Sequence, residues 1–256
     1  LTAMNEAEIR ESFYAPLAVG TAGLRGIMGA GVNRMNRYTV GQTTQGLADV
    51  LNRMDGAAQK GVAISYDCRM HSESFAREAA AILAANGIRV FLFESMRPTP
   101  ELSFAVRSLK CAAGINITAS HNPKEYNGYK VYWSDGAQIG DEIASQVSEA
   151  MQQCDIFTGV KTMDYQAAVA DGTIQILGHE TDEAFLAAAL SCRLNPDVTQ
   201  NSDISIVYTP FHGTGYRLVP EVFRRIGLKN VHCVPEQMQP DGAFSTVKSP
   251  NPEEIE

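Results

Sequence analysis

The chain lacks the long apolar runs, paired cysteines and basic excess that mark several large classes of protein. No stretch approaches the roughly 18 consecutive apolar residues of a membrane-spanning helix. The opening residues, LTAMNEAEIRESF, do not join a basic start to an apolar core, so we expect no signal peptide. The net charge of −8 argues against broad binding to nucleic-acid phosphates. We therefore predict neither a membrane nor a nucleic-acid partner.

Cysteines are few, and none belongs to a C-x-x-C pair. The five of them lie at positions 68, 111, 154, 192 and 233. Their odd number and wide spacing favour neither a disulfide framework nor a zinc site. We expect reduced, mostly buried thiols and a cytoplasmic protein. A hydrophobic content of 45% with 20% charged residues is typical of a globular protein, and 256 residues allow one large domain or two ordinary ones.

Short β-rich runs alternate with helical periods, which is typical of an α/β fold. Helices are predicted to begin near residues 40, 72, 98 and 140, with Ser72 as a cap and Gly87 as a helix end. The predicted strands are 61–67, 88–93, 112–118 and 129–133. Because the last two are joined by too few residues for a crossover helix, we expect a mixed, mainly parallel sheet sandwiched by helices.

The pattern stops and then restarts in the second half of the chain. A polar stretch over residues 155–180 is interpreted as a connection. Helical spacing returns in HETDEAFLAAALSCRL and GYRLVPEVFRRIGL, and strand patterns in DISIVYTP and NVHCVPE. Two confident strands are fewer than the roughly five or six of a typical sheet. We predict two domains, 1–177 and 178–256, the second being the first part of a similar α/β domain.

The segment ITASHNPKEYNGYKVYW, residues 117–133, holds the most informative polar residues. A loop of small residues exposes Ser120 beside His121, and two turn-forming pairs, Asn-Pro and Asn-Gly, lead back to Lys130. No G-x-S-x-G element surrounds the serine, which argues against acyl transfer. On the residues alone, Ser120 is either a nucleophile helped by a base or cation, or part of an ordinary surface turn.

A glycine-rich string, GTAGLRGIMGAGVNRMN, occupies residues 20–36. Its glycines indicate sharp backbone bends that can present N–H groups to an anion, and Arg25 could offer two parallel donors to a phosphate. A structural ion pair is the alternative role for Arg25. No predicted strand precedes the glycines, which argues against a dinucleotide-binding fingerprint.

Other polar residues are interpreted mainly as structural. Asp67 and Arg69 follow a predicted strand, and we favour an ion pair between them, with a supporting role in a site as the alternative. His212 is expected to be structural, as are the histidines that lack a spaced partner, at positions 71, 179 and 232.

The motif T-A-S-H-N-P followed by N-G-Y-K resembles the phosphoserine loop of the α-D-phosphohexomutases, the family of phosphoglucomutases and phosphomannomutases. Residues 20–36 resemble the Gly-Thr-x-Gly-x-Arg-Gly segment of the same family. The strings YTPFHGTGY (208–216) and PEQMQPDGAFSTVKSPNPEE (235–254) resemble its second domain, in the branch of bacterial phosphoglucomutases and eukaryotic phosphopentomutases. The resemblance covers nearly the whole chain, but only about half of the family's length.

The resemblance implies that phosphorylated Ser120 transfers its phosphoryl group to a sugar monophosphate, through a bisphosphorylated intermediate that then returns its other phosphoryl group. It implies Mg²⁺ with Ser120 as a ligand, and glucose 1,6-bisphosphate or an equivalent as activator. Whether His121 or Lys130 moves the proton stays open. The implied catalytic residues are Ser120, His121, Lys130 and Arg25, and the implied substrate-binding residues are Thr21, Arg25, Asn122 and Lys130.

The family's magnesium loop, sugar-recognition loop and C-terminal phosphate-binding domain have no counterpart here, so we expect this chain alone to be inactive or nearly so. The expected partner is a small phosphosugar. Phosphopentomutase and phosphomannomutase activities are the alternatives within the enzyme class. A non-catalytic α/β module that binds a phosphosugar or a protein is the alternative outside it, and phosphorylation of Ser120 distinguishes the two classes.

Overall fold

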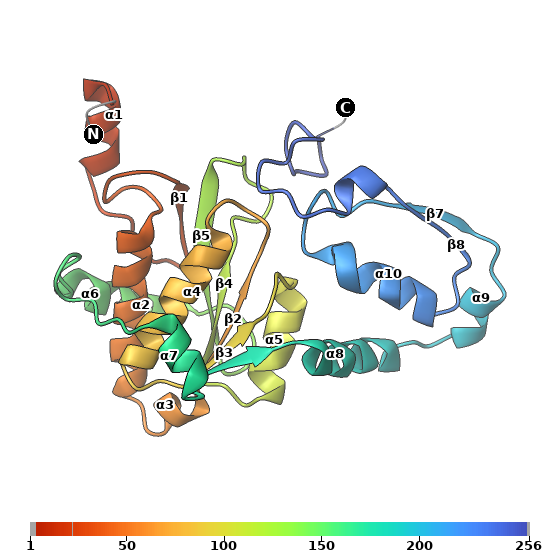
Figure 1. The fold of residues 1–256 in the computed structure, drawn as a ribbon, viewed down its shortest axis with the longest axis horizontal. Coiled ribbons are helices and arrows are strands. Elements are labelled where there is room, and N and C mark those ends of the chain that lie inside the picture. The colour runs from red at the N-terminus through yellow and green to blue at the C-terminus, as the bar shows by residue number, and fades with distance from the viewer. Residues whose placement is uncertain (1–3, 22, 255–256) are drawn as a thin grey trace.

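The computed structural model describes residues 4–21 and 23–254, which form two sheets with helices around them (Figure 1). In the larger sheet, β2, β3, β4 and β6 run parallel, and β5 is antiparallel to both of its neighbours. The expected mixed, mainly parallel sheet is confirmed. Its strands in spatial order are β1 (Leu24–Ile27), β5 (Tyr126–Trp133), β4 (Ala113–Ile117), β2 (Val62–Tyr66), β3 (Val90–Phe93) and β6 (Ile174–Leu177).

Helices cover both faces of this sheet (Figure 1). Every residue of β2, β3 and β4 is buried, as expected for strands covered on both sides. One face carries α2 (Arg37–Asn52), α4 (Ser72–Ala85), α6 (Asp141–Gln153) and α7 (Tyr165–Ala170). The other face carries α5 (Thr99–Ser108), against which α8 (His179–Ser191) packs. The short α1 (Glu6–Phe13) and α3 (Ala57–Lys60) lie at the periphery.

Two edge strands differ from the sequence prediction. β1 lies inside the glycine-rich string, where no strand was predicted, and β6 lies in the stretch 155–180, which was predicted to be only a connection. Each has four residues, and in β6 only the first and last are buried. So short a strand shows no alternating pattern, and its pairing depends on partners distant in the chain.

The start of α4 also differs from the prediction. Ser72 is the first helical residue and not its cap, because His71 precedes it in a left-handed conformation with φ of 67°. The Ser72 hydroxyl donates instead to the Asp67 carboxylate at 2.7 Å. Gly87, with φ of 75°, follows the end of the helix as predicted.

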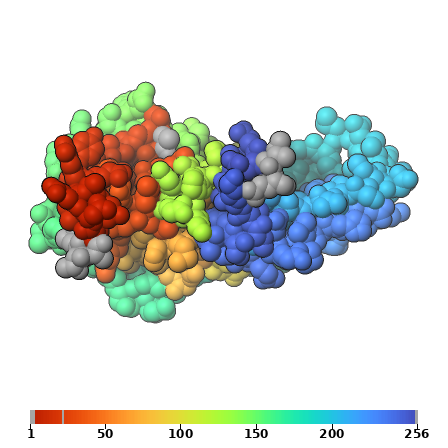
Figure 2. Space-filling view, turned by 90° about the horizontal axis from the view of Figure 1, so that it is seen from above, coloured from red at the N-terminus to blue at the C-terminus, as the bar shows by residue number. Residues whose placement is uncertain are grey.

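The C-terminal lobe (residues 195–254) extends to one side of the rest of the chain (Figure 2). Helix α8 leads from the first sheet to the lobe, and it packs on α5 through the rings of Phe104 and Phe185, whose centroids lie 5.7 Å apart. The lobe contains α9 (Pro196–Gln200), the parallel pair β7 (Ser205–Tyr208) and β8 (Asn230–Cys233), α10 (Gly215–Arg225) and a 3₁₀ turn (Pro235–Gln237).

All five cysteines are free, as predicted. The expectation that most are buried was wrong, because only Cys111 is buried, Cys192 is exposed and the other three are half-buried. Within the described part of the chain, no helix is long and apolar enough to cross a membrane.

Candidate active site

The Ser120 loop (residues 118–126) runs from the carboxyl end of β4 to Tyr126, the first residue of β5. Ser120 is exposed and has φ of 58°, in the left-handed region that residues with a Cβ rarely adopt. Its amide donates to Thr118 Oγ1 at 3.0 Å, and its Oγ lies 3.4 Å from His121 Nδ1. The loop therefore presents the serine hydroxyl to solvent with one imidazole beside it.

Strand β1 brings Arg25 to this loop. The Arg25 guanidinium donates to Asn122 Oδ1 at 2.8 Å, across 97 positions of sequence. The register pairs Arg25 with Gly128, where an added Cβ would lie 2.6 Å from the Thr118 carbonyl oxygen and 3.0 Å from that of Leu24. Gly128 thus allows β1 and the loop to approach β5 closely. The glycine-rich string (residues 20–36) and the Ser120 segment (residues 117–133) therefore meet at the Arg25–Asn122 bond.

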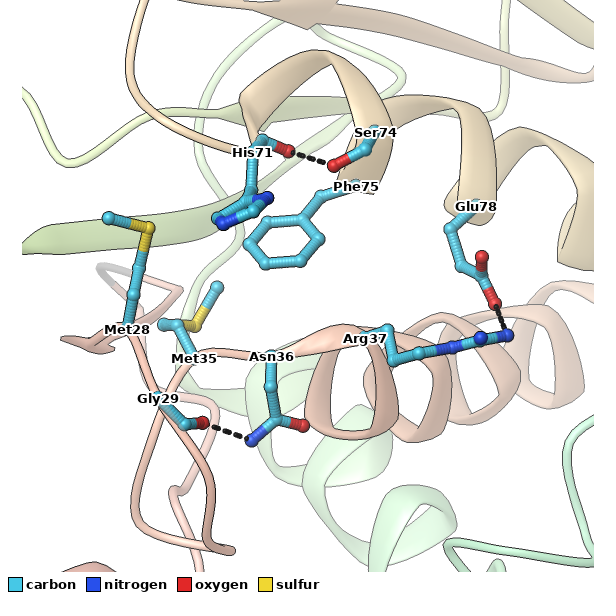
Figure 3. Close-up of a pocket in the computed structure, with 9 residues that line it drawn as sticks. All are labelled: Met28, Gly29, Met35, Asn36, Arg37, His71, Ser74, Phe75 and Glu78. Carbon is cyan, nitrogen blue, oxygen red and sulfur yellow. Dashed lines mark hydrogen bonds and ion pairs between the residues drawn. The ribbon is translucent and has the colours of Figure 1, made fainter. Parts of the chain in front are cut away.

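The segment after β1 is held by Asn36, the cap of α2 (Figure 3). The side-chain amide nitrogen of Asn36 donates to the carbonyls of Gly29 and Gly31, both at 2.9 Å. Its side-chain oxygen accepts from the backbone N–H groups of Tyr38 and Thr39 in the first turn of α2. Arg37 and Glu78, 3.3 Å apart, link α2 to α4 across a cavity of about 570 Å³ (Figure 3). The Asn36 bonds fix the segment after β1 to the start of α2.

Lys130 is half-buried in β5, next to the place where Gly23 lies against this strand. An added Cβ at Gly23 would lie 2.2 Å from the Tyr129 carbonyl oxygen and 2.8 Å from Lys130 Cα, so the turn that holds Gly23 rests directly on β5. Burial and the neighbouring Arg25 charge lower the pKa of Lys130. Thr21 is exposed in the turn, and its side chain forms no hydrogen bond with the described residues.

Arg69 holds the Ser120 loop from below. One terminal nitrogen donates to the carbonyls of Pro123 at 2.9 Å and Tyr126 at 3.0 Å. The other donates to those of Ser120 at 2.9 Å and Asn122 at 2.6 Å. These four bonds were not predicted from the sequence, which indicated only that Asp67 and Arg69 after β2 could support a site.

Asp67 links β2 to the loop and to α4. Its carboxylate lies 3.4 Å from Arg69 Nε, which confirms the predicted ion pair. It also accepts from the hydroxyls of Thr118 at 2.6 Å and Ser72 at 2.7 Å. Burial raises the pKa of Asp67, while these bonds and the Arg69 charge oppose the rise. Asp67 is fully engaged in structure and orients Thr118 under the Ser120 amide.

A cleft of about 440 Å³ lies between the Ser120 loop and the C-terminal lobe. This volume is within the range of small-molecule sites. Residues from both parts of the chain line it, including Asn116, Ser120 and His121 on one side and Tyr208, Thr214 and Phe244 on the other.

A buried ionic cluster joins the lobe to the first sheet beside this cleft. Arg97 is 1% exposed and makes two bonds with Asp182, at 2.7 and 3.0 Å. Arg217 of the lobe lies 3.4 Å from Asp182 and 3.2 Å from Glu94. Burial, together with Asp182, raises the pKa of Glu101 to about 8. Glu101 is therefore largely protonated at neutral pH, which lessens the cost of packing two buried carboxyl groups, those of Glu101 and Asp182, around Arg97.

His212 is buried, and both of its ring nitrogens have partners: the Gln239 carbonyl at 2.8 Å and Thr246 Oγ1 at 2.7 Å. These bonds support the structural role predicted for it.

The implied magnesium site is not complete in the described residues. Among residues 4–21 and 23–254, no three His, Cys, Asp or Glu side chains lie together in a way that could hold a metal ion. The Ser120 hydroxyl alone is no Mg²⁺ site, because Mg²⁺ takes about six oxygen ligands with at least one carboxylate or phosphate among them.

Comparison with known proteins defines the class. The model of phosphoglucomutase/phosphomannomutase α/β/α domain I matches residues 16–155, and that of domain II matches residues 183–256. The chain belongs to the phosphoglucomutase/phosphomannomutase family, whose members are phosphohexomutase isomerases.

Individual relatives carry different activities in their names. Human phosphopentomutase is 38% identical over 257 residues, covering 98% of this chain and 42% of that protein. The phosphoglucomutase of Staphylococcus haemolyticus is 39% identical, covering 96% and 44%. A crystal structure titled as a putative phosphomannomutase from Thermus thermophilus is 27% identical to this chain, with a TM-score of 0.75. The match covers 94% of this chain and 49% of that one. The chain spans less than half the length of the curated relatives it matches.

Proposed function

We propose that this chain is the phosphoserine-bearing part of a phosphoglucomutase-type phosphotransferase that interconverts sugar 1-phosphates and sugar 6-phosphates. One observation carries the proposal: Ser120 is exposed on a tightly held loop at a cleft of about 440 Å³, with Arg25 bonded to the same loop. On this proposal the boundary between the two domains lies near residue 177, where the first sheet ends. We also propose a cytoplasmic location, consistent with five free cysteines.

In the proposed reaction, a hydroxyl oxygen of the sugar monophosphate forms a bond to the phosphorus on Ser120, and the bond from phosphorus to Ser120 Oγ breaks. The resulting bisphosphate turns over and returns its other phosphoryl group to Oγ by the same exchange of bonds. The protein's task is positioning and neutralisation of charge. Arg25 would hold phosphoryl oxygens, while Asn122 and Thr21 would contact the sugar phosphate.

The proton of the attacking hydroxyl needs an acceptor in this reaction. The lowered pKa of Lys130 makes a neutral amine more accessible, which supports Lys130 as that acceptor. His121, 3.4 Å from Ser120 Oγ, is the second candidate for proton transfer, because from that place it would give a proton to Oγ as the bond to phosphorus breaks and take it back in the return step. The family generally uses Mg²⁺, but the described residues do not form its site. We therefore assign Ser120 as only one ligand of the ion and assign no step to the metal.

A phosphopentose is the second candidate substrate, because a phosphopentomutase and a phosphoglucomutase match the chain almost equally, at 38% and 39% identity. Glucose 1,6-bisphosphate, or the corresponding bisphosphate of another sugar, would act as activator by loading Ser120.

The test is phosphoryl uptake by the purified full-length protein that contains this chain, because the residues described here do not form a complete Mg²⁺ site. We expect incubation with Mg²⁺ and glucose 1,6-bisphosphate to add one phosphoryl group, which mass spectrometry maps to Ser120. Ser120→Ala should take up none, whereas Ser134→Ala, which alters another exposed serine, should behave as wild type. Ribose and mannose bisphosphates tested in parallel rank the sugars. No uptake from any of the three would favour a non-catalytic binding module.

A further inference from the structure

The backbone of Ser120 needs support from its surroundings. With φ of 58°, Ser120 is in a conformation that is unfavourable for a residue with a Cβ, and its side chain is exposed, so side-chain packing does not hold it. A strained residue persists only where neighbouring contacts determine its geometry. In this loop such contacts are made to the backbone, and most of them come from one side chain.

Arg69 supplies them. The residue is 3% exposed, and its two terminal nitrogens donate to the carbonyls of four residues of the Ser120 loop. A guanidinium has four hydrogens on those nitrogens, so every one of them bonds to the loop. The fifth donor, Nε, faces Asp67 at 3.4 Å. Nε is buried and makes no hydrogen bond within the described residues, so no N–H of Arg69 is open to a ligand and Arg69 influences chemistry only through the loop.

Arg69 is itself covered by the C-terminal lobe. The Phe244 ring lies over the guanidinium, with its centroid 5.2 Å from Arg69 Cζ, and the residue is 5% exposed. Phe244 also has a left-handed backbone, with φ of 51°. Asp241 builds the turn that presents it, by accepting from the amides of Ala243 and Ser245, both at 2.8 Å.

The same turn docks against the chain on either side of Arg69. An added Cβ at Gly242 would lie 2.7 Å from the Cys68 carbonyl oxygen and 2.8 Å from the Met70 amide nitrogen. Contact this close lets any movement of the turn change the packing on Arg69. A continuous path of contacts thus runs from the lobe through Phe244 and Arg69 to the backbone of Ser120.

We propose that Arg69 is a positioning residue for Ser120, and that Phe244 of the C-terminal lobe holds Arg69 in place, so that docking of the lobe controls the order and reactivity of the Ser120 loop. The part concerning reactivity rests on the proposed role of Ser120 as phosphoryl carrier. The part concerning order does not. When the lobe is displaced, the guanidinium loses its cover and becomes open to water, which competes for its four bonds.

Hydrogen exchange of the purified protein measures loop order directly. Arg69→Lys keeps the charge but has three donors in place of five, so it cannot hold four carbonyls. We expect exchange in peptides covering residues 118–126 to rise about tenfold, since several bonds of a buried charged donor are lost. Phe244→Leu keeps apolar volume without a ring face, and we expect a rise of about threefold.

Arg89→Lys is the matched control, because its guanidinium lies 4.8 Å from the Phe91 ring but does not contact the loop. It should leave loop exchange unchanged. If Arg69→Lys raises exchange throughout the protein, it has unfolded the chain, and Phe244→Leu then decides the question. Loop exchange equal to wild type in Phe244→Leu, with the fold intact, would overturn the proposal.

Phosphoryl uptake at Ser120 distinguishes this proposal from the proposed function. We expect the maximal rate of uptake to fall in Phe244→Leu, and further in Arg69→Lys, at saturating glucose 1,6-bisphosphate. The concentration of glucose 1,6-bisphosphate that gives half of the maximal rate should change less, because Arg69 does not contact the ligand. If loop exchange rises in the variants but wild type takes up no phosphoryl group, the phosphoryl-carrier function is refuted and the positioning role of Arg69 stands. If both variants take up the phosphoryl group normally and their loop exchange is unchanged, the positioning role of Arg69 is refuted and the phosphoryl-carrier function stands.

Discussion

Gly23 offers a sharp test of how the glycine-rich turn positions Arg25. Its φ is 81°, and an added Cβ would lie 2.2 Å from the Tyr129 carbonyl oxygen and 2.8 Å from Lys130 Cα. Both obstacles are backbone atoms of a paired strand, which cannot rotate away. Gly23→Ala must therefore either strain the turn or lift β1 from β5.

Both routes have a similar cost. The left-handed conformation disfavours alanine by about 1–2 kcal/mol, and the overlap adds about 1–3 kcal/mol if the turn stays in place. Lifting β1 instead exposes Leu24, which is 1% exposed, at about 1.5–3 kcal/mol. We expect Gly23→Ala to lower the free energy of unfolding by about 2–3 kcal/mol, and to weaken the contact of Arg25 with Asn122.

Urea unfolding measures the loss of stability, and hydrogen exchange over residues 24–28 reports whether β1 has lifted. Gly20→Ala is the control near Gly23, because among the described residues no atom beyond its chain neighbours lies within 4 Å of its added Cβ. It should change stability by no more than about 0.5 kcal/mol. Equal midpoints and equal β1 protection in the two variants would refute the close-packing argument.

Two further predictions concern buried ionisable groups. The folded state keeps a proton on Glu101 up to about pH 8, whereas the unfolded chain releases it near pH 4.5, so this group's contribution to stability is full below pH 4.5 and declines as the pH rises to 8. Because Glu101→Gln cannot ionise at this position, its free energy of unfolding in urea should rise by about 2 kcal/mol relative to wild type between pH 6 and pH 9. If the free energies of unfolding of the two proteins change in parallel over this range, the prediction is wrong. His212→Ala removes a buried ring and its bonds to the Gln239 carbonyl and the Thr246 hydroxyl, and should cost about 1–3 kcal/mol in thermal or urea unfolding. His179→Ala, at a side chain that is 75% exposed, should cost no more than about 0.5 kcal/mol, and equal costs for the two would show that His212 is not structural.

Local patterns in the sequence were sufficient to predict the α/β class, most of the helices and strands of the first sheet, and the antiparallel pair that carries Ser120. Each of these depends on hydrophobic periodicity or turn chemistry within one short segment, as in the buried run of β4 or the Asn-Pro pair at positions 122–123. The Asn-Gly pair at positions 127–128, predicted to form a turn, lies instead inside β5, because both residues pair with β1. The same strings were specific enough to indicate the family, which the two family models confirm.

The tertiary structure alone decided how those segments support one another. β1 and β6 pair with strands distant in the chain and have too few residues to show a period. Arg69 reaches carbonyls 51 to 57 positions away, and Phe244 covers it from another part of the protein. Such contacts depend on where the chain returns in space. An arginine that organises a loop and one in a surface ion pair therefore look alike in sequence, because the four carbonyls that distinguish them carry no side-chain signal.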